Sequence, residues 1–294
     1  MLKSELLRKG NTIEHAENYW KSFDGVKLYS QTWFALHEQR AIINLIHGFG
    51  EYSGRYSHWA IEMAKKGFTV RSYDMRGHGR SEGKRGYSSG YHKLLNDLEL
   101  FINNGKAEYA DIPFFLYGFS FGGNLAVNFA IQTNSEISGL IISSPWLELA
   151  KKYSPVKITL AKLIGAILPG VLVNNGIKAE DISRDLRAVH HYRTDPLVHD
   201  RIGIRLALQI MEAGRKASMS IYKINVPLLV MHGSSDNITS CRASRDFVRN
   251  AGERTTFIEW EGGFHELHND LDQEKVFNSL VDWLDTYTIT QKSN

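Results

Sequence analysis

Short apolar runs alternate along this chain with segments whose hydrophobic residues recur every three or four positions. Runs of four to six apolar residues are typical of strands buried on both faces, whereas the longer spacing is typical of helices with one buried side. Strands that alternate with helices predict an α/β protein with a mostly parallel central sheet and helices on both of its faces. The strand-like runs lie at residues 41–46, 69–73, 114–117, 139–143, 227–232 and 255–259.

The chain departs from this alternation in two places, at its start and after residue 146. At the start, residues 19–23 and 26–34 flank an Asp-Gly turn and predict an antiparallel pair. After residue 146 the alternation stops, and the next strand-like run begins only at residue 227, which is too long for an ordinary crossover. We therefore divide the chain into a first core part at residues 1–145, an inserted helical lid at 146–199, and a second core part at 200–294.

One apolar stripe marks the predicted lid. Its members recur at three- and four-residue spacing, as on one face of a helix. They are Leu160, Leu163, Ile164, Ile167, Leu168 and Val171. Lysine is the only charged residue type from Lys151 to Lys178, and an apolar stripe flanked by positive charge suits contact with an anionic lipid surface. The alternative is that the stripe packs over the active site and has no other role.

A serine lies at the junction between an apolar run and a helix-like segment. Residues 114–117 predict a buried strand, residues 121–127 predict the helix after it, and Ser120 falls at the bend in a Gly-Phe-Ser-Phe-Gly sequence. The flanking glycines let the strand and helix backbones approach closely, so that the serine hydroxyl points out above the end of the sheet. The helix N-terminus favours a developing negative charge there. This context predicts a nucleophile, whereas the five-residue string alone is often only a turn.

A serine nucleophile needs a base and an acid that orients the base, in the chain order Ser, Asp or Glu, His for this type of turn. Asp236 follows the strand-like run at 227–232, and His265 lies in a glycine-opened loop after the run at 255–259. Both side chains can therefore reach the sheet edge that carries Ser120. Asp195 is a rival for the acid, but it lies inside the insertion rather than after a core strand, so Asp236 is favoured.

A serine hydrolase also needs backbone N–H groups aimed at the carbonyl oxygen of its substrate. The apolar run at 41–46 leads into His47-Gly48-Phe49-Gly50, whose glycines allow a close backbone approach. We expect the N–H groups of Phe49 and Phe121 to form this oxyanion hole.

Composition sets further limits on function. With 294 residues, 43% of them hydrophobic, the chain is long enough to bury a large core. Its single cysteine, Cys241, cannot form an intrachain disulfide, and the first ten residues lack the pattern of a secretory signal. No apolar stretch reaches the length of a membrane span. We expect a cytoplasmic protein with peripheral membrane contact through the lid, and a net charge of +3 without a basic tail predicts no nucleic-acid partner.

Several longer motifs make the chain similar to the monoglyceride lipase family of α/β-hydrolases, over residues 23 to 284. The most specific is residues 47–56, His-Gly-Phe-Gly-Glu-Tyr-Ser-Gly-Arg-Tyr, which resembles the oxyanion segment of the family and its continuation. The other matching segments are residues 76–79, 81–83, 192–197 and 265–268. The resemblance implies the α/β-hydrolase fold, a Ser120–Asp236–His265 triad, no cofactor, and a monoacylglycerol or related lipid ester as the substrate.

The resemblance also implies a head-group site and leaves alternatives. Glu51, Arg55, Tyr192 and His268 match family positions that hold glycerol. No metal is expected, because the His-Glu-x-x-His pattern would need a histidine where Asn269 stands. The alternative activity is that of a lysophospholipase or a broad carboxylesterase with the same triad. A serine aminopeptidase is disfavoured because the lid offers no acidic cluster for a peptide amine, and a non-catalytic binding module usually lacks a triad member.

Overall fold

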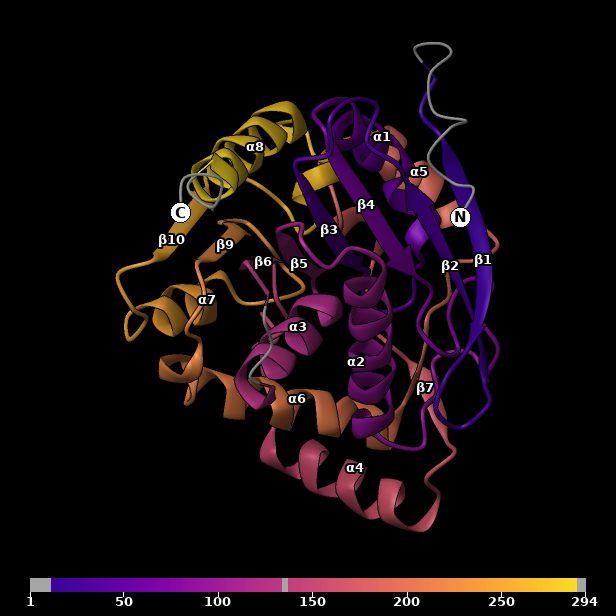
Figure 1. Ribbon diagram of the computed structural model, residues 1–294. Helices are drawn as coiled ribbons and strands as arrows, with labels where there is room; N and C mark the ends of the chain where they lie inside the picture. Colours follow the sequence, from indigo (N-terminus) through magenta and orange to yellow (C-terminus); the bar gives the residue numbers. More distant parts are fainter. Residues whose placement is uncertain (1–11, 134–136, 290–294) are drawn as a thin grey trace.

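The computed structural model of the chain describes residues 12–133 and 137–289 (Figure 1). Its central sheet has eight strands in the order β1-β2-β4-β3-β5-β6-β9-β10. The strands β1 and β2 are antiparallel, β2 is antiparallel to β4, and every later pairing is parallel. The strands are β1 (His15–Lys21), β2 (Lys27–Trp33), β3 (Ala41–Ile46), β4 (Phe68–Tyr73), β5 (Phe114–Phe119), β6 (Gly139–Ser143), β9 (Leu228–Gly233) and β10 (Thr255–Trp260). The predicted mostly parallel sheet is confirmed.

Helices cover both faces of this sheet and bury a separate apolar cluster against each. Along β3, Ile42 and Ile46 belong to one cluster, whereas Ile43 and Leu45 belong to the other, because successive side chains of a strand point to opposite faces. One face packs against α2 (Tyr91–Glu108), α3 (Phe121–Gln132), α6 (Ile204–Ser218) and α7 (Cys241–Val248); the other packs against α1 (Ser57–Lys65) and α8 (Gln273–Ile289). This arrangement explains why most of the core strands are largely apolar along their whole length.

The predicted lid falls in the long connection from β6 to β9. It contains α4 (Pro155–Ile167), β7 (Leu172–Asn174), the short helix η2 (Ala179–Asp181) and α5 (Leu186–Thr194). A second strand in this connection, β8 (Arg201–Gly203), pairs with β7 in a two-stranded antiparallel sheet, so the segment closes just beyond the predicted boundary at residue 199. The remaining short helices of the described chain are η1 (Ser53–Tyr56), η3 (Ile221–Lys223) and η4 (Leu267–Asn269).

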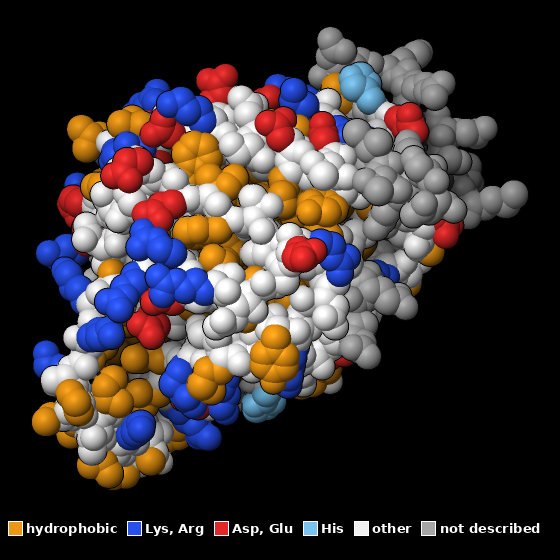
Figure 2. All heavy atoms as spheres, turned by 90° about the vertical axis from the view of Figure 1, so that its left-hand side faces the viewer, with side chains coloured by type: hydrophobic (Ala, Val, Ile, Leu, Met, Phe, Trp, Pro, Cys, Tyr) orange, Lys and Arg blue, Asp and Glu red, His pale blue; other side chains and the backbone are white. Residues whose placement is uncertain are grey.

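Helix α4 lies on the outer side of α6, away from the central sheet (Figure 1). Gly165 is its only fully buried residue and faces the backbone of Arg205 on α6. The stripe residues Leu163 and Ile167 lie on the outside and are 58% and 76% exposed. Figure 2 shows hydrophobic side chains gathered at the bottom of the molecule, where α4 lies, with Lys and Arg side chains around them. Packing over the active site therefore does not account for this part of the stripe.

Across residues 12–133 and 137–289, no helix combines the length and the apolar character that crossing a membrane requires.

Candidate active site

Ser120 occupies the sharp turn between β5 and α3, as the sequence predicts. Its backbone has φ 53° and ψ −114°, a conformation that residues other than glycine rarely adopt. The turn is possible because Gly118 and Gly122 lack side chains: a Cβ on Gly118 would clash with the Gly122 carbonyl, and a Cβ on Gly122 would clash with the carbonyls of Ile46 and His47. The nucleophile candidate is thus held in a strained position by close backbone packing.

His265 and Asp236 meet Ser120 at the carboxyl ends of three parallel strands. His265 Nε2 lies 3.0 Å from Ser120 Oγ, and His265 Nδ1 lies 2.7 Å from Asp236 Oδ2. An ionised aspartate can only accept, so the ring proton belongs on Nδ1, and Nε2 is free to accept the serine proton. All three side chains are buried. The structure brings the predicted triad together in hydrogen-bonding order.

Asp236 is held by more donors than His265 alone. Its Oδ1 accepts the backbone N–H groups of Ile238 and Thr239, and its Oδ2 accepts the Thr239 hydroxyl at 2.8 Å. A second buried histidine, His232, places Nε2 at 3.1 Å from the same Oδ2, while its Nδ1 faces the Ser244 hydroxyl. Burial alone would raise the pKa of Asp236, but the two histidines outweigh it and hold this pKa below its ordinary value.

The environment of His265 makes it a stronger base. Burial by itself would lower the pKa of its imidazole, but the adjacent Asp236 carboxylate outweighs burial and holds the pKa above its ordinary value. The backbone carbonyl of His265 also accepts the Ser144 hydroxyl at 2.8 Å. His265 is therefore fixed at both its ring and its backbone.

The loop that carries Phe49 is fixed by His47. The backbone N–H of Met75 donates to His47 Nε2 at 2.9 Å, so Nδ1 carries the ring proton and donates to the Gly48 carbonyl at 2.7 Å. The peptide group is planar, so holding this carbonyl also fixes the direction of the Phe49 N–H. Phe121 begins α3, where an N–H has no partner within the helix. This placement supports the prediction that these two amides form an oxyanion hole.

The four residues predicted to hold a glycerol head group lie close together. Arg55 donates to Glu51 at 2.7 Å, and its guanidinium lies over the ring of Tyr192. It also makes a two-point hydrogen bond to Glu266, at 2.7 and 2.8 Å, which the sequence reading missed. Burial opposes the charge of Arg55, yet the two carboxylates outweigh it and raise the pKa of the guanidinium.

His268 differs from its neighbours in this group. Its ring stacks on that of Tyr56 at 4.6 Å between centroids, and both ring nitrogens are buried without a hydrogen-bond partner among the described residues. Burial lowers the pKa of His268 to about 3, so the ring is neutral at physiological pH. A neutral imidazole with two unpaired nitrogens can still accept one hydrogen bond and donate another.

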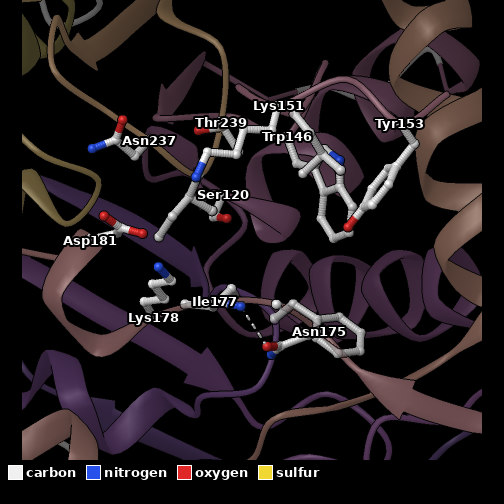
Figure 3. A pocket seen from close by; sticks show the side chains of 14 residues that line it. Ser120, Trp146, Lys151, Tyr153, Asn175, Ile177, Lys178, Asp181, Asn237 and Thr239 are labelled. Carbon is white, nitrogen blue, oxygen red and sulfur yellow. Dashed lines mark hydrogen bonds between the residues drawn. The ribbon is translucent and has the colours of Figure 1, made fainter.

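A cavity of about 110 Å³ opens onto Ser120 (Figure 3). The core contributes Phe49 and residues 237–239, and the predicted lid contributes Trp146, Leu149, Lys151, Tyr153, residues 175–178 and Asp181. None of the four predicted head-group residues lies in this lining. The predicted lid thus forms one wall of the space in front of the nucleophile.

Two alternatives from the sequence can be placed as well. Asp195 accepts the Tyr52 hydroxyl at 2.8 Å and the Leu197 N–H, whereas Asp236 holds the histidine of the triad. In the part of the chain that the structure describes, no group of three His, Cys, Asp or Glu residues is arranged to hold a metal ion.

A serine at a strand-to-helix turn, bonded through a histidine to an aspartate on neighbouring strands, defines a serine hydrolase of the α/β-hydrolase fold. The family model described as serine aminopeptidase, S33 matches residues 37–272. The chain belongs to this family, and it is a serine ester hydrolase.

Relatives support the resemblance to monoglyceride lipases that the motifs predict. The chain is 29% identical to a monoacylglycerol lipase of Mycolicibacterium smegmatis, covering 92% of this chain and 96% of that one. It is 33% identical to an abhydrolase domain-containing protein of Dictyostelium discoideum over 89% of this chain, but it spans only 28% of that longer protein. The solved structure of a soluble variant of monoglyceride lipase from Saccharomyces cerevisiae, in complex with a substrate analogue, has a TM-score of 0.86, with 27% identity over 95% of this chain and 98% of that one.

Proposed function

We propose that the protein hydrolyses monoacylglycerols to glycerol and free fatty acid. The observation that carries this proposal is the buried hydrogen-bonded series Ser120, His265, Asp236 at the base of a cavity, in a chain whose relatives include monoacylglycerol lipases from a bacterium and a yeast. A lipid ester is the substrate class that these relatives share by name.

The reaction follows from the geometry of the triad. His265 Nε2 accepts the Ser120 proton as Oγ attacks the ester carbonyl, and Asp236 stabilises the imidazolium that forms. The Phe49 and Phe121 amides stabilise the oxyanion. Glycerol then leaves with the proton from His265, and a water molecule, activated by the same histidine, releases the fatty acid from Ser120. None of these reaction steps uses a cofactor.

The residues predicted to hold the head group differ in their capacity to bind a substrate hydroxyl. Glu51 already accepts hydrogen bonds from Gly48, Arg55 and Tyr56, which leaves it little capacity for a substrate hydroxyl. Both ring nitrogens of His268 lack a partner in the described part of the chain, so His268 is the member of the group best able to bind a glycerol hydroxyl. The Arg55 guanidinium lies over the Tyr192 ring, and Arg55 is close enough to His268 to help lower its pKa. The family resemblance implies that these residues complete the head-group site.

The acyl chain must extend beyond this cavity. The cavity at Ser120 is smaller than the roughly 300–1,000 Å³ usual for ligand pockets. The lid residues that narrow it precede or follow α4, whose outer face exposes Leu160, Leu163 and Ile167 beside Lys157 and Lys162. We infer that this face contacts an anionic lipid surface, and that such contact brings the lipid substrate to the lid.

The direct test is replacement of the nucleophile. Ser120→Ala should lower kcat on a monoacylglycerol by roughly 10⁴–10⁶ and abolish labelling by a fluorophosphonate probe, while the unfolding temperature stays near that of the wild type. Asp195→Asn serves as the control, because that carboxylate bonds Tyr52 and lies outside the triad. Retention of more than a tenth of the wild-type turnover by Ser120→Ala would overturn the assignment.

A further inference from the structure

The cavity in front of Ser120 is lined by two lysines and by a side-chain amide donor without a partner among the described residues. Lys151 and Lys178 both line it, and neither has a carboxylate within ion-pair distance among the described residues. One acid, Asp181, shares the lining, so the charged side chains sum to a net positive wall. Figure 3 shows the three side chains around the cavity that also exposes Ser120.

Asn175 supplies a second, independent observation. Its Oδ1 accepts the Ile177 N–H at 3.0 Å, which fixes the orientation of the side-chain amide. Its Nδ2 is buried and has no hydrogen-bond partner among the described residues. This nitrogen lies against Gly50, at the end of the loop that carries the Phe49 amide. A buried donor without a partner is costly unless a ligand supplies an acceptor.

The two lid segments that carry these groups are anchored to the site. Leu149 forms a β-bridge with Thr239, and Ala150 donates to the Ile238 carbonyl at 3.0 Å, so the chain leading to Lys151 is tied to the Asp236 loop. The backbone N–H of Asn175 donates to the Asp200 carbonyl at 2.7 Å, and His199 donates to Gly50 at 2.8 Å. The side-chain donors are therefore carried by backbone segments that are held next to the triad.

We propose, building on the hydrolysis proposed above, that this cavity accepts monoacylglycerols whose glycerol carries a phosphate, that is, anionic lysophospholipids. A phosphate offers acceptors and negative charge, which match one amide donor and two ammonium groups. The acyl group passes to Ser120 Oγ and then to water, and the glycerol phosphate leaves with the proton from His265. A zwitterionic phosphocholine head group should bind more weakly than an anionic one, because the same lysines repel its quaternary ammonium group.

The test compares two soluble substrates below the concentrations at which they form micelles, octanoylglycerol and octanoylglycerophosphate. The wild type should hydrolyse the phosphate ester with a kcat/KM at least equal to that of the neutral ester. We define the selectivity ratio as kcat/KM for octanoylglycerophosphate divided by kcat/KM for octanoylglycerol. The double variant Lys151→Gln/Lys178→Gln should lower this ratio by about fivefold or more, as expected for the loss of two partly exposed ion pairs. Lys152→Gln is the matched control, since Lys152 is adjacent in sequence but outside this cavity.

Asn175→Asp separates recognition from folding. The aspartate keeps the acceptor for Ile177, while it removes the donor and adds a negative charge, so the ratio should fall by about tenfold. Inorganic phosphate should also inhibit octanoylglycerol hydrolysis competitively in the wild type and less so in the double lysine variant. Hydrolysis of octanoylglycerol with no activity on the phosphate ester, or an unchanged ratio in both variants, would overturn the inference and leave the monoacylglycerol proposal standing. Failure on both substrates would overturn both.

Discussion

Glu51 accepts the backbone N–H of Gly48 at 2.6 Å, three residues back along the loop that carries the proposed oxyanion amide. The same carboxylate accepts a hydrogen bond from Arg55. Arg55 also donates two hydrogen bonds to Glu266, the residue after the proposed general base His265. Burial raises the pKa of the Glu266 carboxyl, but Arg55 outweighs it and holds this pKa below its ordinary value. One arginine therefore joins the oxyanion loop to the histidine loop through two carboxylates.

Glu51→Gln tests this link. The glutamine amide keeps one acceptor oxygen, but an NH₂ group replaces the other oxygen. Because the amide is uncharged, its interaction with Arg55 is weaker, and the Gly48–Phe49 peptide should lose its alignment. We expect kcat to fall by about 10- to 100-fold on a monoacylglycerol and on a 4-nitrophenyl ester alike. Glu62→Gln, an exposed carboxylate on α1, is the control. A loss confined to the monoacylglycerol would instead show that Glu51 reads the glycerol.

The pH dependence of acylation follows from His265. This ring must be neutral to accept the Ser120 proton, and Asp236 raises its pKa above the ordinary value. The rate of fluorophosphonate labelling should therefore fall as pH drops through an apparent pKa above about 6.5. Asp236→Asn removes the stabilising charge and should move this limb to lower pH, with labelling slower by roughly 10⁴ at its plateau. An unshifted limb in Asp236→Asn would mean that another group controls the profile.

Gly122→Ala tests the close approach behind the nucleophile. In most helices this change is stabilising by about 1 kcal/mol. Here the added Cβ would clash with two backbone carbonyls of the β3 end, and we expect a net loss of ~1–3 kcal/mol or more. Gly252→Ala is the control, because nothing lies within 4 Å of its added Cβ. Thermal unfolding of both variants gives the comparison, and equal stabilities would contradict the clash.

The sheet and the triad could be predicted from sequence because their signals are local. Most core strands are short, largely apolar runs, and Ser120, Asp236 and His265 each follow a core strand, so parallel strand ends had to bring them to one edge. The contacts around them were not predictable in this way. Arg55 and Glu266 are 211 residues apart, and their pairing depends on how two loops fold over the sheet edge.

For the lid, the sequence predicts a helix but not the direction in which its apolar face points. Its apolar periodicity predicts a helix, and α4 covers most of the stripe. Periodicity does not say whether an apolar face points inward, and only the packing of Gly165 against α6 shows that Leu163 and Ile167 lie outside. The cavity donor Asn175 was missed for a related reason: its Oδ1 caps a local turn, which is a common surface role for asparagine.

The exposed face of α4 gives the last prediction. Leu163→Ser/Ile167→Ser removes two outward apolar side chains, so the free energy of unfolding should change little. If this face enters a lipid surface, each side chain contributes up to about 1.5–3 kcal/mol, and binding to anionic vesicles in a co-sedimentation assay should weaken about tenfold or more. Leu186→Ser, 80% exposed on α5, is the matched control for removing an exposed leucine elsewhere on the lid. Activity on vesicle-borne monoacylglycerol should fall more than activity on a soluble short-chain ester. Equal losses on both, with no vesicle binding by the wild type, would contradict a membrane role.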